Sequence, residues 1–290
     1  MGANTLRLLV AAQAGDKLVA VGEQRAQLGL GAEIERTGFV STNLIDRAAT
    51  TVQAQVRRAR KLRCMRLEVL VTSPGRQAAN AGELLEALAQ ATDVTTRVLS
   101  AEEEAELAWR GAVAAEDGLP ETVAVCDVGG GSSQIAVGAS GGLPSWVRSV
   151  DLGSLRLTRR AFRNDPPDVE DVTRAGNAVA SAFADVVPPS PLAAIAVGGT
   201  ARALRKVVGD DLTEESLLLA VRRLAKHPSK KIAKEYGVVE VRARTMTAGA
   251  LIFFELERRL GVGLRVARGG VREGAALALL ADVETAVRSA

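Results

Sequence analysis

The sequence is poor in the residue types that build several common active sites. Its 290 residues include one histidine, His227, and two cysteines, Cys64 and Cys126. His227 lies in a polar, lysine-containing stretch, and the two cysteines lack the close spacing of metal ligands. The sequence therefore argues against a histidine-based catalytic triad and against a zinc site. Cys126 lies in an apolar run and is interpreted as a small core residue, and unpaired cysteines fit the cytoplasm.

Long apolar runs and blocks of like charge are also missing. No stretch approaches the roughly 18 uninterrupted apolar residues of a membrane span, and the first residues lack the pattern of a signal peptide. The 37 Lys and Arg residues are spread along the chain and nearly balance 34 Asp and Glu residues, for a net charge of +3. We therefore expect a cytoplasmic globular protein that crosses no membrane and binds no specific nucleic acid.

Apolar residues recur with the spacing of helices that alternate with strands, which predicts an α/β fold. The expected elements of the first part are strands at 6–10 and 17–21, a helix at 42–62, a strand at 66–72, a helix at 80–91, a strand at 95–99 and a helix at 100–113. Residues 116–120 are polar and contain Gly and Pro, as in a connection between domains.

The opening pattern recurs after this connection. The segment from Gly2 to Thr5 aligns with the segment from Gly129 to Ser132, and each is followed by a strand with a second hairpin strand behind it. We therefore predict two similar domains, residues 1–117 and residues 118–290, and we expect the last helix to pack back on the first domain.

The sharpest local motif begins at Asp127, where an apolar strand ends in a carboxylate followed by Val128, three glycines and two serines. Small residues let backbone amides approach an anion closely. The motif leads into a strand and lacks the P-loop lysine, so it is interpreted as a hairpin phosphate loop, with a purely structural hairpin as the alternative. Two Gly-Gly turns, at Gly198 and Gly269, lead from strands into helices, whose N-termini favour anions.

Two charged residues, Glu104 and Arg76, are further candidates. Glu103 fits a capping box with Ser100, whereas Glu104 is not explained by capping and is a candidate to accept a proton from water. Arg76 follows a predicted strand and offers a planar, bidentate donor for phosphoryl oxygens, although a solvent-facing loop arginine is the simpler interpretation.

Together these segments resemble the exopolyphosphatase and guanosine pentaphosphate phosphatase (Ppx/GppA) family of the sugar kinase and actin superfamily. Seven segments carry the resemblance in family order: 2–10, 71–80, 99–107, 127–133, 152–158, 197–200 and 270–274. The resemblance implies two ribonuclease H-like, actin-type domains with a cleft between them. It also implies a Mg²⁺-dependent hydrolase that releases terminal phosphate from inorganic polyphosphate, or alternatively from guanosine penta- or tetraphosphate, and a homodimer.

The resemblance also assigns roles to individual residues. Glu104 falls on the catalytic base, and Asp127 and Gln134 fall on the metal site. The phosphate-binding positions are Asn4, Thr5, Arg76, Gly129, Gly130, Gly131, Ser132, Gly198, Gly199 and Thr200.

Two positions depart from the family pattern. The first loop of the family begins with an Asp that would lie directly before Met1, so we expect the natural chain to begin one strand upstream. Gln134 stands where the family usually carries Glu, and an amide supplies no charge to a metal. These departures leave a non-catalytic polyphosphate or alarmone sensor as a rival hypothesis, whereas the short chain argues against a sugar or acetate kinase.

Overall fold

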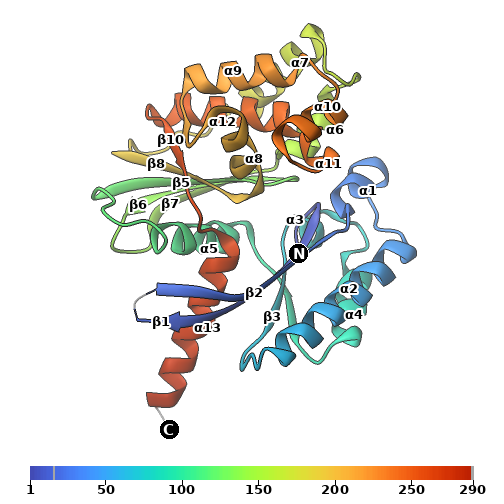
Figure 1. Ribbon diagram of the computed structural model, residues 1–290, viewed down its shortest axis with the longest axis vertical. Helices are drawn as coiled ribbons and strands as arrows, with labels where there is room; N and C mark the ends of the chain where they lie inside the picture. The colour runs from blue at the N-terminus through green and yellow to red at the C-terminus, as the bar shows by residue number, and fades with distance from the viewer. Residues whose placement is uncertain (16, 289–290) are drawn as a thin grey trace.

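The chain folds into two halves with helices between and around them, and the predicted α/β fold is confirmed (Figure 1). The first half, the lower one in Figure 1, contains the strands between residues 5 and 98, and the second half, the upper one, contains the strands between residues 122 and 266. The computed structural model describes residues 1–15 and 17–288. The strands are β1 Thr5–Ala14, β2 Lys17–Gln27, β3 Glu68–Val71, β4 Thr95–Val98, β5 Thr122–Val128, β6 Ser133–Ala139, β7 Pro144–Val150, β8 Ala193–Val197, β9 Asp211–Leu212 and β10 Leu264–Val266. The helices are α1 Leu30–Thr37, α2 Thr42–Lys61, α3 Ser73–Gln77, α4 Ala81–Ala91, α5 Ala101–Val113, α6 Ser154–Ala161, α7 Val169–Ala182, α8 Gly198–Val208, α9 Glu214–Leu224, α10 Ser229–Tyr236, α11 Glu240–Ala243, α12 Met246–Leu260 and α13 Val271–Arg288.

The second half is built on a mixed sheet with the strand order β7-β6-β5-β8-β10-β9. The central strand β5 pairs antiparallel with β6 and parallel with β8. Most residues of β5 are buried, because helices cover both faces of this part of the sheet. The main core lies between one face and helices that include α8, α9 and α12. This arrangement fixes the end of β5, where Asp127 lies.

The described part of the first half contains two separate two-stranded sheets. β1 and β2 form an antiparallel hairpin, whereas β3 and β4 pair in parallel. Alternating residues of β1 are buried from Leu6 to Val10, and α2 and α4 enclose a core with β3. The predicted hairpin and the predicted strand–helix alternation are confirmed here.

Two helices join the halves. α5 packs on the second sheet, where Trp109 is fully buried and its Nε1 donates to Gly142 O at 2.9 Å. α13 packs along α5 and also contacts β1. The approach of α13 to α5 requires glycine, because a Cβ on Gly111 would lie 2.1 Å from Gly270 O and one on Gly274 would lie 1.9 Å from Leu107 O.

The predicted domain boundary between residues 117 and 118 stays a prediction. Residues 289–290, at the end of the predicted second domain, lie outside the described residues. Within the described ranges, no helix has the length and apolar character that crossing a bilayer requires.

Polar contacts also tie the halves together. The buried Arg156 guanidinium pairs through Nε with Glu35 Oε1 of α1 and through Nη1 with Asp151 Oδ2 at 2.7 Å. Gln77 of α3 donates from Nε2 to Asp151 Oδ1 at 2.5 Å. These contacts connect α1 and α3 to the second half on one side of the interface.

Candidate active site

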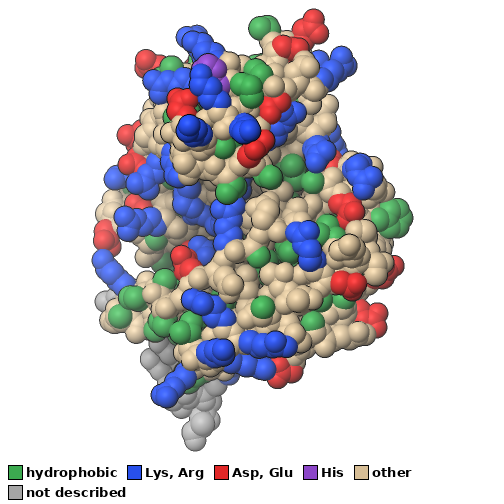
Figure 2. Space-filling view, turned by 45° about the vertical axis from the view of Figure 1, so that its right-hand side comes forward, with side chains coloured by type: hydrophobic (Ala, Val, Ile, Leu, Met, Phe, Trp, Pro, Cys, Tyr) green, Lys and Arg blue, Asp and Glu red, His purple; other side chains and the backbone are tan. Residues whose placement is uncertain are grey.

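A cavity of about 650 Å³ lies between the two halves. Its polar end is formed by four segments that come from distant parts of the sequence: the turn at Ala3–Thr5, the loop at Gly129–Ser132, the turn at Gly198–Thr200 and the start of α5 at Glu104. Lys and Arg side chains gather in the indentation between the halves (Figure 2). The fold therefore brings the predicted phosphate loops and the predicted base to one cavity.

Glu104 is buried at the start of α5, and the local sequence explains its position. Ser100 Oγ accepts from Glu103 N at 3.0 Å, and Glu103 Oε2 accepts from Ser100 N at 2.7 Å, so Glu103 completes the predicted capping box. Glu104 Oε2 instead accepts from Arg76 Nη2 at 2.8 Å, while Arg76 Nη1 donates to Leu99 O at 2.8 Å. The arginine thus fixes one carboxylate oxygen of Glu104 in the lining of the cavity.

Asp127 lies near the carboxyl end of β5 and lines the same cavity as Glu104. Burial raises its pKa to about 6, and the negative charge of Glu104 adds to the shift, whereas Arg202 and Arg7 oppose it. Gly198 lies against the Asp127 carboxylate, and a Cβ on Gly198 would lie 2.1 Å from Asp127 Oδ1. The φ of Gly198 is 86°, which also favours glycine. Only glycine fits this position, so the turn and the carboxylate form one packed unit.

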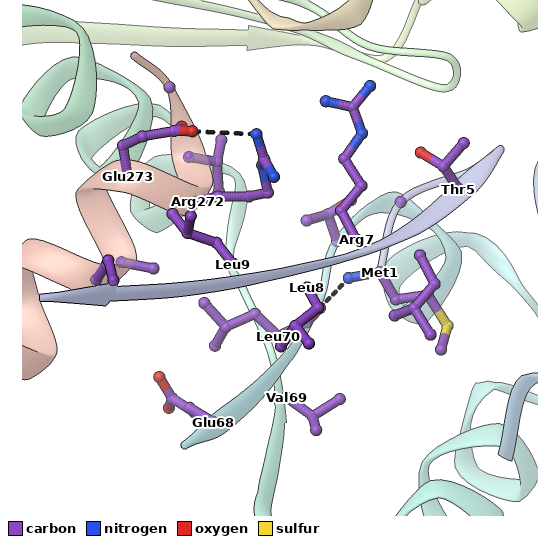
Figure 3. A pocket seen from close by; sticks show the side chains of 18 of the residues that line it. Met1, Thr5, Arg7, Leu8, Leu9, Glu68, Val69, Leu70, Arg272 and Glu273 are labelled. Carbon is purple, nitrogen blue, oxygen red and sulfur yellow. Dashed lines mark hydrogen bonds and ion pairs between the residues drawn. The ribbon is translucent and has the colours of Figure 1, made fainter. Parts of the chain in front are cut away.

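Three arginines line the same cavity without an ion pair among the described residues: Arg7 of β1, Arg202 of α8 and Arg242 of α11. Burial, together with the charges of neighbouring arginines, lowers the pKa of Arg7 and of Arg242 to about 10. A Cβ on Gly199 would lie 3.0 Å from Arg242 Nη2 and 3.2 Å from Arg7 Nη2, so these two guanidinium groups converge over the Gly-Gly turn. Figure 3 shows Arg7 pointing away from Leu70 and Leu8 pointing toward it.

Buried cations without acidic partners are costly, and they favour an anion in the cavity. Arg242 Nη1 donates to Thr200 Oγ1 at 3.2 Å, which leaves the remaining donors of the three arginines for a ligand. Arg272 lies nearby but pairs with Glu273 and Glu23, both at 3.1 Å. The site therefore combines two carboxylates with an excess of arginine, as expected for recognition of phosphoryl groups.

Comparison with known proteins decides the family. A family model described as the Ppx/GppA phosphatase family matches residues 9–282. The chain belongs to the Ppx/GppA phosphatase family. Exopolyphosphatase 2 of Mycobacterium tuberculosis is 27% identical to it over 96% of each chain. Membership in the Ppx/GppA family confirms the predicted class of enzyme, a phosphoanhydride hydrolase.

Solved structures of the Ppx/GppA family share the fold. The family member from Aquifex aeolicus has a TM-score of 0.83 at 24% identity, covering 97% of this chain and 96% of its own. An exopolyphosphatase from Cytophaga hutchinsonii has a TM-score of 0.87 at 20% identity, with the same coverage. The likeness confirms the predicted fold of two actin-type domains.

Most of the residues that the Ppx/GppA resemblance singled out line the cavity. These are Asn4, Thr5, Glu104, Asp127, Gly129, Gly130, Ser132, Gly198, Gly199 and Thr200. Three others are not among the lining residues. Arg76 holds Glu104, Gly131 packs against Ser73 and Gln77, and Gln134 donates from Nε2 to Ser132 Oγ at 2.9 Å and to Ser149 Oγ at 3.1 Å. Their predicted roles in ligand binding stay predictions.

The donor set at Asp127 fits a magnesium ion that is shared with a substrate. The described residues contain no group of three or more His, Cys, Asp or Glu side chains that could hold a metal. Mg²⁺, however, is usually held by one or two carboxylates together with substrate phosphates and water. The raised pKa of Asp127 indicates a carboxylate that would gain from a nearby cation.

Sequence reasoning missed the three arginines that have no acidic partner among the residues that the structure describes. Arg7 alternates with the buried Leu6 and Leu8, and Arg202 follows the Gly-Gly turn by three residues, so both positions carried a weak signal. Arg242 carried none, because α11 is a short helix far along the chain from either phosphate loop.

Proposed function

We propose that the protein releases terminal phosphate from inorganic polyphosphate in a Mg²⁺-dependent reaction. The observation that carries the proposal is the convergence of Arg7, Arg202 and Arg242 on the cavity that also holds Glu104 and Asp127. A chain of phosphates repeats its negative charge at every unit, and a cluster of arginines matches such a ligand. The name of the mycobacterial relative supports the same substrate.

In this mechanism Glu104 acts as the general base. The carboxylate oxygen that accepts from Arg76 is fixed in place, so the carboxylate is held ready to take a proton from a water that attacks the terminal phosphorus. The water oxygen forms the new P–O bond as its proton passes to Glu104, and the bond from the terminal phosphorus to the bridging oxygen breaks, which leaves that oxygen with the bonding electrons on the shortened chain. The products are inorganic phosphate and a polyphosphate shorter by one unit.

The other residues bind and orient the substrate. Amides of the Gly129–Ser132 loop and of the Gly198–Thr200 turn would donate to phosphoryl oxygens, and the three arginines would neutralise the adjoining phosphates. Bound Mg²⁺ would supply charge neutralisation at the phosphoryl oxygens nearest Asp127. Positioning and electrostatics account for most of the catalysis in reactions of this type.

The test is phosphate release from long-chain polyphosphate by the Glu104→Gln variant. Glutamine can still accept a hydrogen bond from Arg76 but cannot take a proton, so we expect the rate to fall by about 10²–10⁴-fold. Glu102→Gln is the matched control, because Glu102 lies exposed on the same helix turn. A Glu104→Gln variant with an undiminished rate would remove Glu104 from the mechanism.

A competition experiment separates the substrates. Guanosine pentaphosphate and polyphosphate are supplied together, and phosphate release from each is followed with distinct labels. Faster phosphate release from the nucleotide would identify guanosine pentaphosphate, and not polyphosphate, as the preferred substrate. Tight polyphosphate binding without release of phosphate, in the presence of Mg²⁺, would instead favour the non-catalytic sensor.

A further inference from the structure

The arginines of the cavity have a further arginine beside them on the hairpin of the first half. Arg25 of β2 lies directly opposite Arg7 of β1 in the antiparallel register. Side chains that are directly opposite in such a pair project from the same face of the sheet and lie within reach of each other. Arg25 is exposed and is not among the residues that line the cavity. It therefore lies one strand beyond Arg7, outside the cavity.

The face of the hairpin that carries both arginines is turned toward the second half. Arg7 leaves β1 on its upper side in Figure 3 and converges with Arg242 of the second half. Glu23 lies two residues before Arg25, on the same face of β2, and pairs with Arg272 at the start of α13 at 3.1 Å. Arg25 therefore faces the indentation between the halves, where Lys and Arg side chains gather (Figure 2).

The charges on this face are not balanced by acidic side chains. Arg7, Arg25 and Arg242 have no acidic partner among the residues that the structure describes, and Glu23 is already paired with Arg272. Burial lowers the pKa of Arg7 and of Arg242, and the positive charge of Arg25 contributes to both shifts. Like charges directly opposite each other destabilise a strand pair. The hairpin therefore carries a repulsion that a bound anion would relieve.

A simpler role for Arg25 does not account for its position. Among the described strands, β2 pairs only with β1, and a charged side chain on such an edge strand can discourage pairing with another chain. That role sets no requirement for the residue opposite, whereas Arg25 lies opposite a second arginine. An anion between the two guanidinium groups would remove their repulsion and accept hydrogen bonds from both. The pair therefore fits a phosphoryl group better than a solvated edge.

We propose that Arg25 binds a phosphate group of the substrate outside the cavity and thereby determines a preference for long phosphate chains over short ones. The inference rests on the proposed function, because it takes the phosphate beside Glu104 and Asp127 as the terminal one. The phosphates that follow lie at Arg7 and Arg242, and the chain leaves the cavity across β2, past Arg25. A ligand with only two phosphates ends before it reaches Arg25.

The experiment measures the binding of long-chain polyphosphate and of pyrophosphate by calorimetry, in EDTA, for the parent protein and three variants. Arg25→Gln removes the charge, and Arg25→Lys keeps it without the planar donors. Arg58→Gln is the matched control, because Arg58 is an exposed arginine of the same half, on α2. The Tm of each protein is measured with and without long-chain polyphosphate. Neither measurement uses phosphate release, so a protein that binds polyphosphate without hydrolysing it would refute the proposed function and still test Arg25.

Arg25→Gln is expected to weaken binding of the long chain about five- to tenfold and to leave the Kd of pyrophosphate within about twofold of the parent. Arg25→Lys should lose less, and Arg58→Gln should bind both ligands as the parent does. Without ligand, the Tm of Arg25→Gln should be no lower than that of the parent, because the repulsion from Arg7 is removed. With the long chain, its Tm should rise less than that of the parent.

Three results would overturn the proposal. One is equal weakening of long-chain binding by Arg25→Gln and Arg58→Gln, which would show an effect of net charge alone. Another is an equal loss of affinity for pyrophosphate and for the long chain in Arg25→Gln, which would place Arg25 at the inner phosphates. The third is a parent protein that binds the two ligands equally, because no subsite would then lie outside the cavity.

Discussion

The charge on Asp127 makes the metal-free protein less stable at neutral pH, and Asp127→Asn is expected to remove this cost. The pKa of Asp127 is raised from 3.8 to about 6 by burial and by Glu104. A shift of this size corresponds to about 2–3 kcal/mol. Asparagine keeps the shape of the side chain without the charge, so the variant should be more stable by about that amount at pH 7, or about 5–10 °C in Tm.

The pH dependence of this difference follows from the direction of the shift. Below about pH 4 the Asp127 carboxyl is protonated in both the folded and the unfolded protein, and Asp127→Asn should have little effect. Between about pH 4 and pH 6 the unfolded protein releases the proton first, so the native protein loses stability as pH rises. Above about pH 6 the cost is constant.

The assay is thermal and urea unfolding from pH 4 to 8 in EDTA, with the exposed Asp46→Asn as the control. Addition of Mg²⁺ should raise the Tm of the parent protein but not that of Asp127→Asn, which should also release no phosphate. An Asp127→Asn variant that is no more stable than its parent at pH 7 in EDTA would refute the reasoning. A stability gain combined with loss of activity is expected where a carboxylate is kept for function.

Three further predictions concern the metal site, the arginines and the helix contact. Gln134→Glu should lower the Mg²⁺ concentration needed for half-maximal phosphate release, measured by magnesium titration, because it adds a carboxylate opposite Asp127. Arg242→Gln should raise the KM for polyphosphate about tenfold or more in steady-state assays and weaken its dependence on salt. Gly111→Ala should destabilise the protein by about 1–3 kcal/mol in urea unfolding, whereas Gly176→Ala, with open space around it, should stabilise it by about 0.5–1 kcal/mol.

Each of these has a clear contrary outcome. A Gln134→Glu variant with an unchanged magnesium requirement would place residue 134 outside the metal site. Exposed Arg222 on α9 provides the control for Arg242, and equal KM values for Arg222→Gln and Arg242→Gln would show that the effect is one of net charge alone. Tolerance of alanine at residue 111 would mean that α13 can shift away from α5.

The features that were predictable from the sequence are those encoded over a few neighbouring residues. The capping box at Ser100 assigns a structural role to Glu103 and leaves Glu104, the next residue, without one. The residues from Asp127 to Ser133 directly predict a strand end, a loop and the start of the next strand. Both predictions match the structure because their geometry depends on local hydrogen bonds and on small side chains.

The features that were missed depend on contacts between distant segments. Trp109 places α5 on the second sheet, although the sequence assigns this helix to the first domain. Arg7 and Arg242 meet over Gly199 only after the two halves have assembled, and each alone resembles an ordinary surface arginine. The pairing of Arg76 with Glu104 likewise crosses between α3 and α5.

This last ion pair makes the orientation of Glu104 depend on both halves at once. Arg76 belongs to α3, which packs with α1 and α4, whereas Glu104 belongs to α5, which packs on the second sheet. A hinge motion that parts α3 from α5 would break the 2.8 Å contact and free the carboxylate to rotate. The contact between α3 and α5 is therefore the part of the packing that holds the Glu104 carboxylate in one orientation.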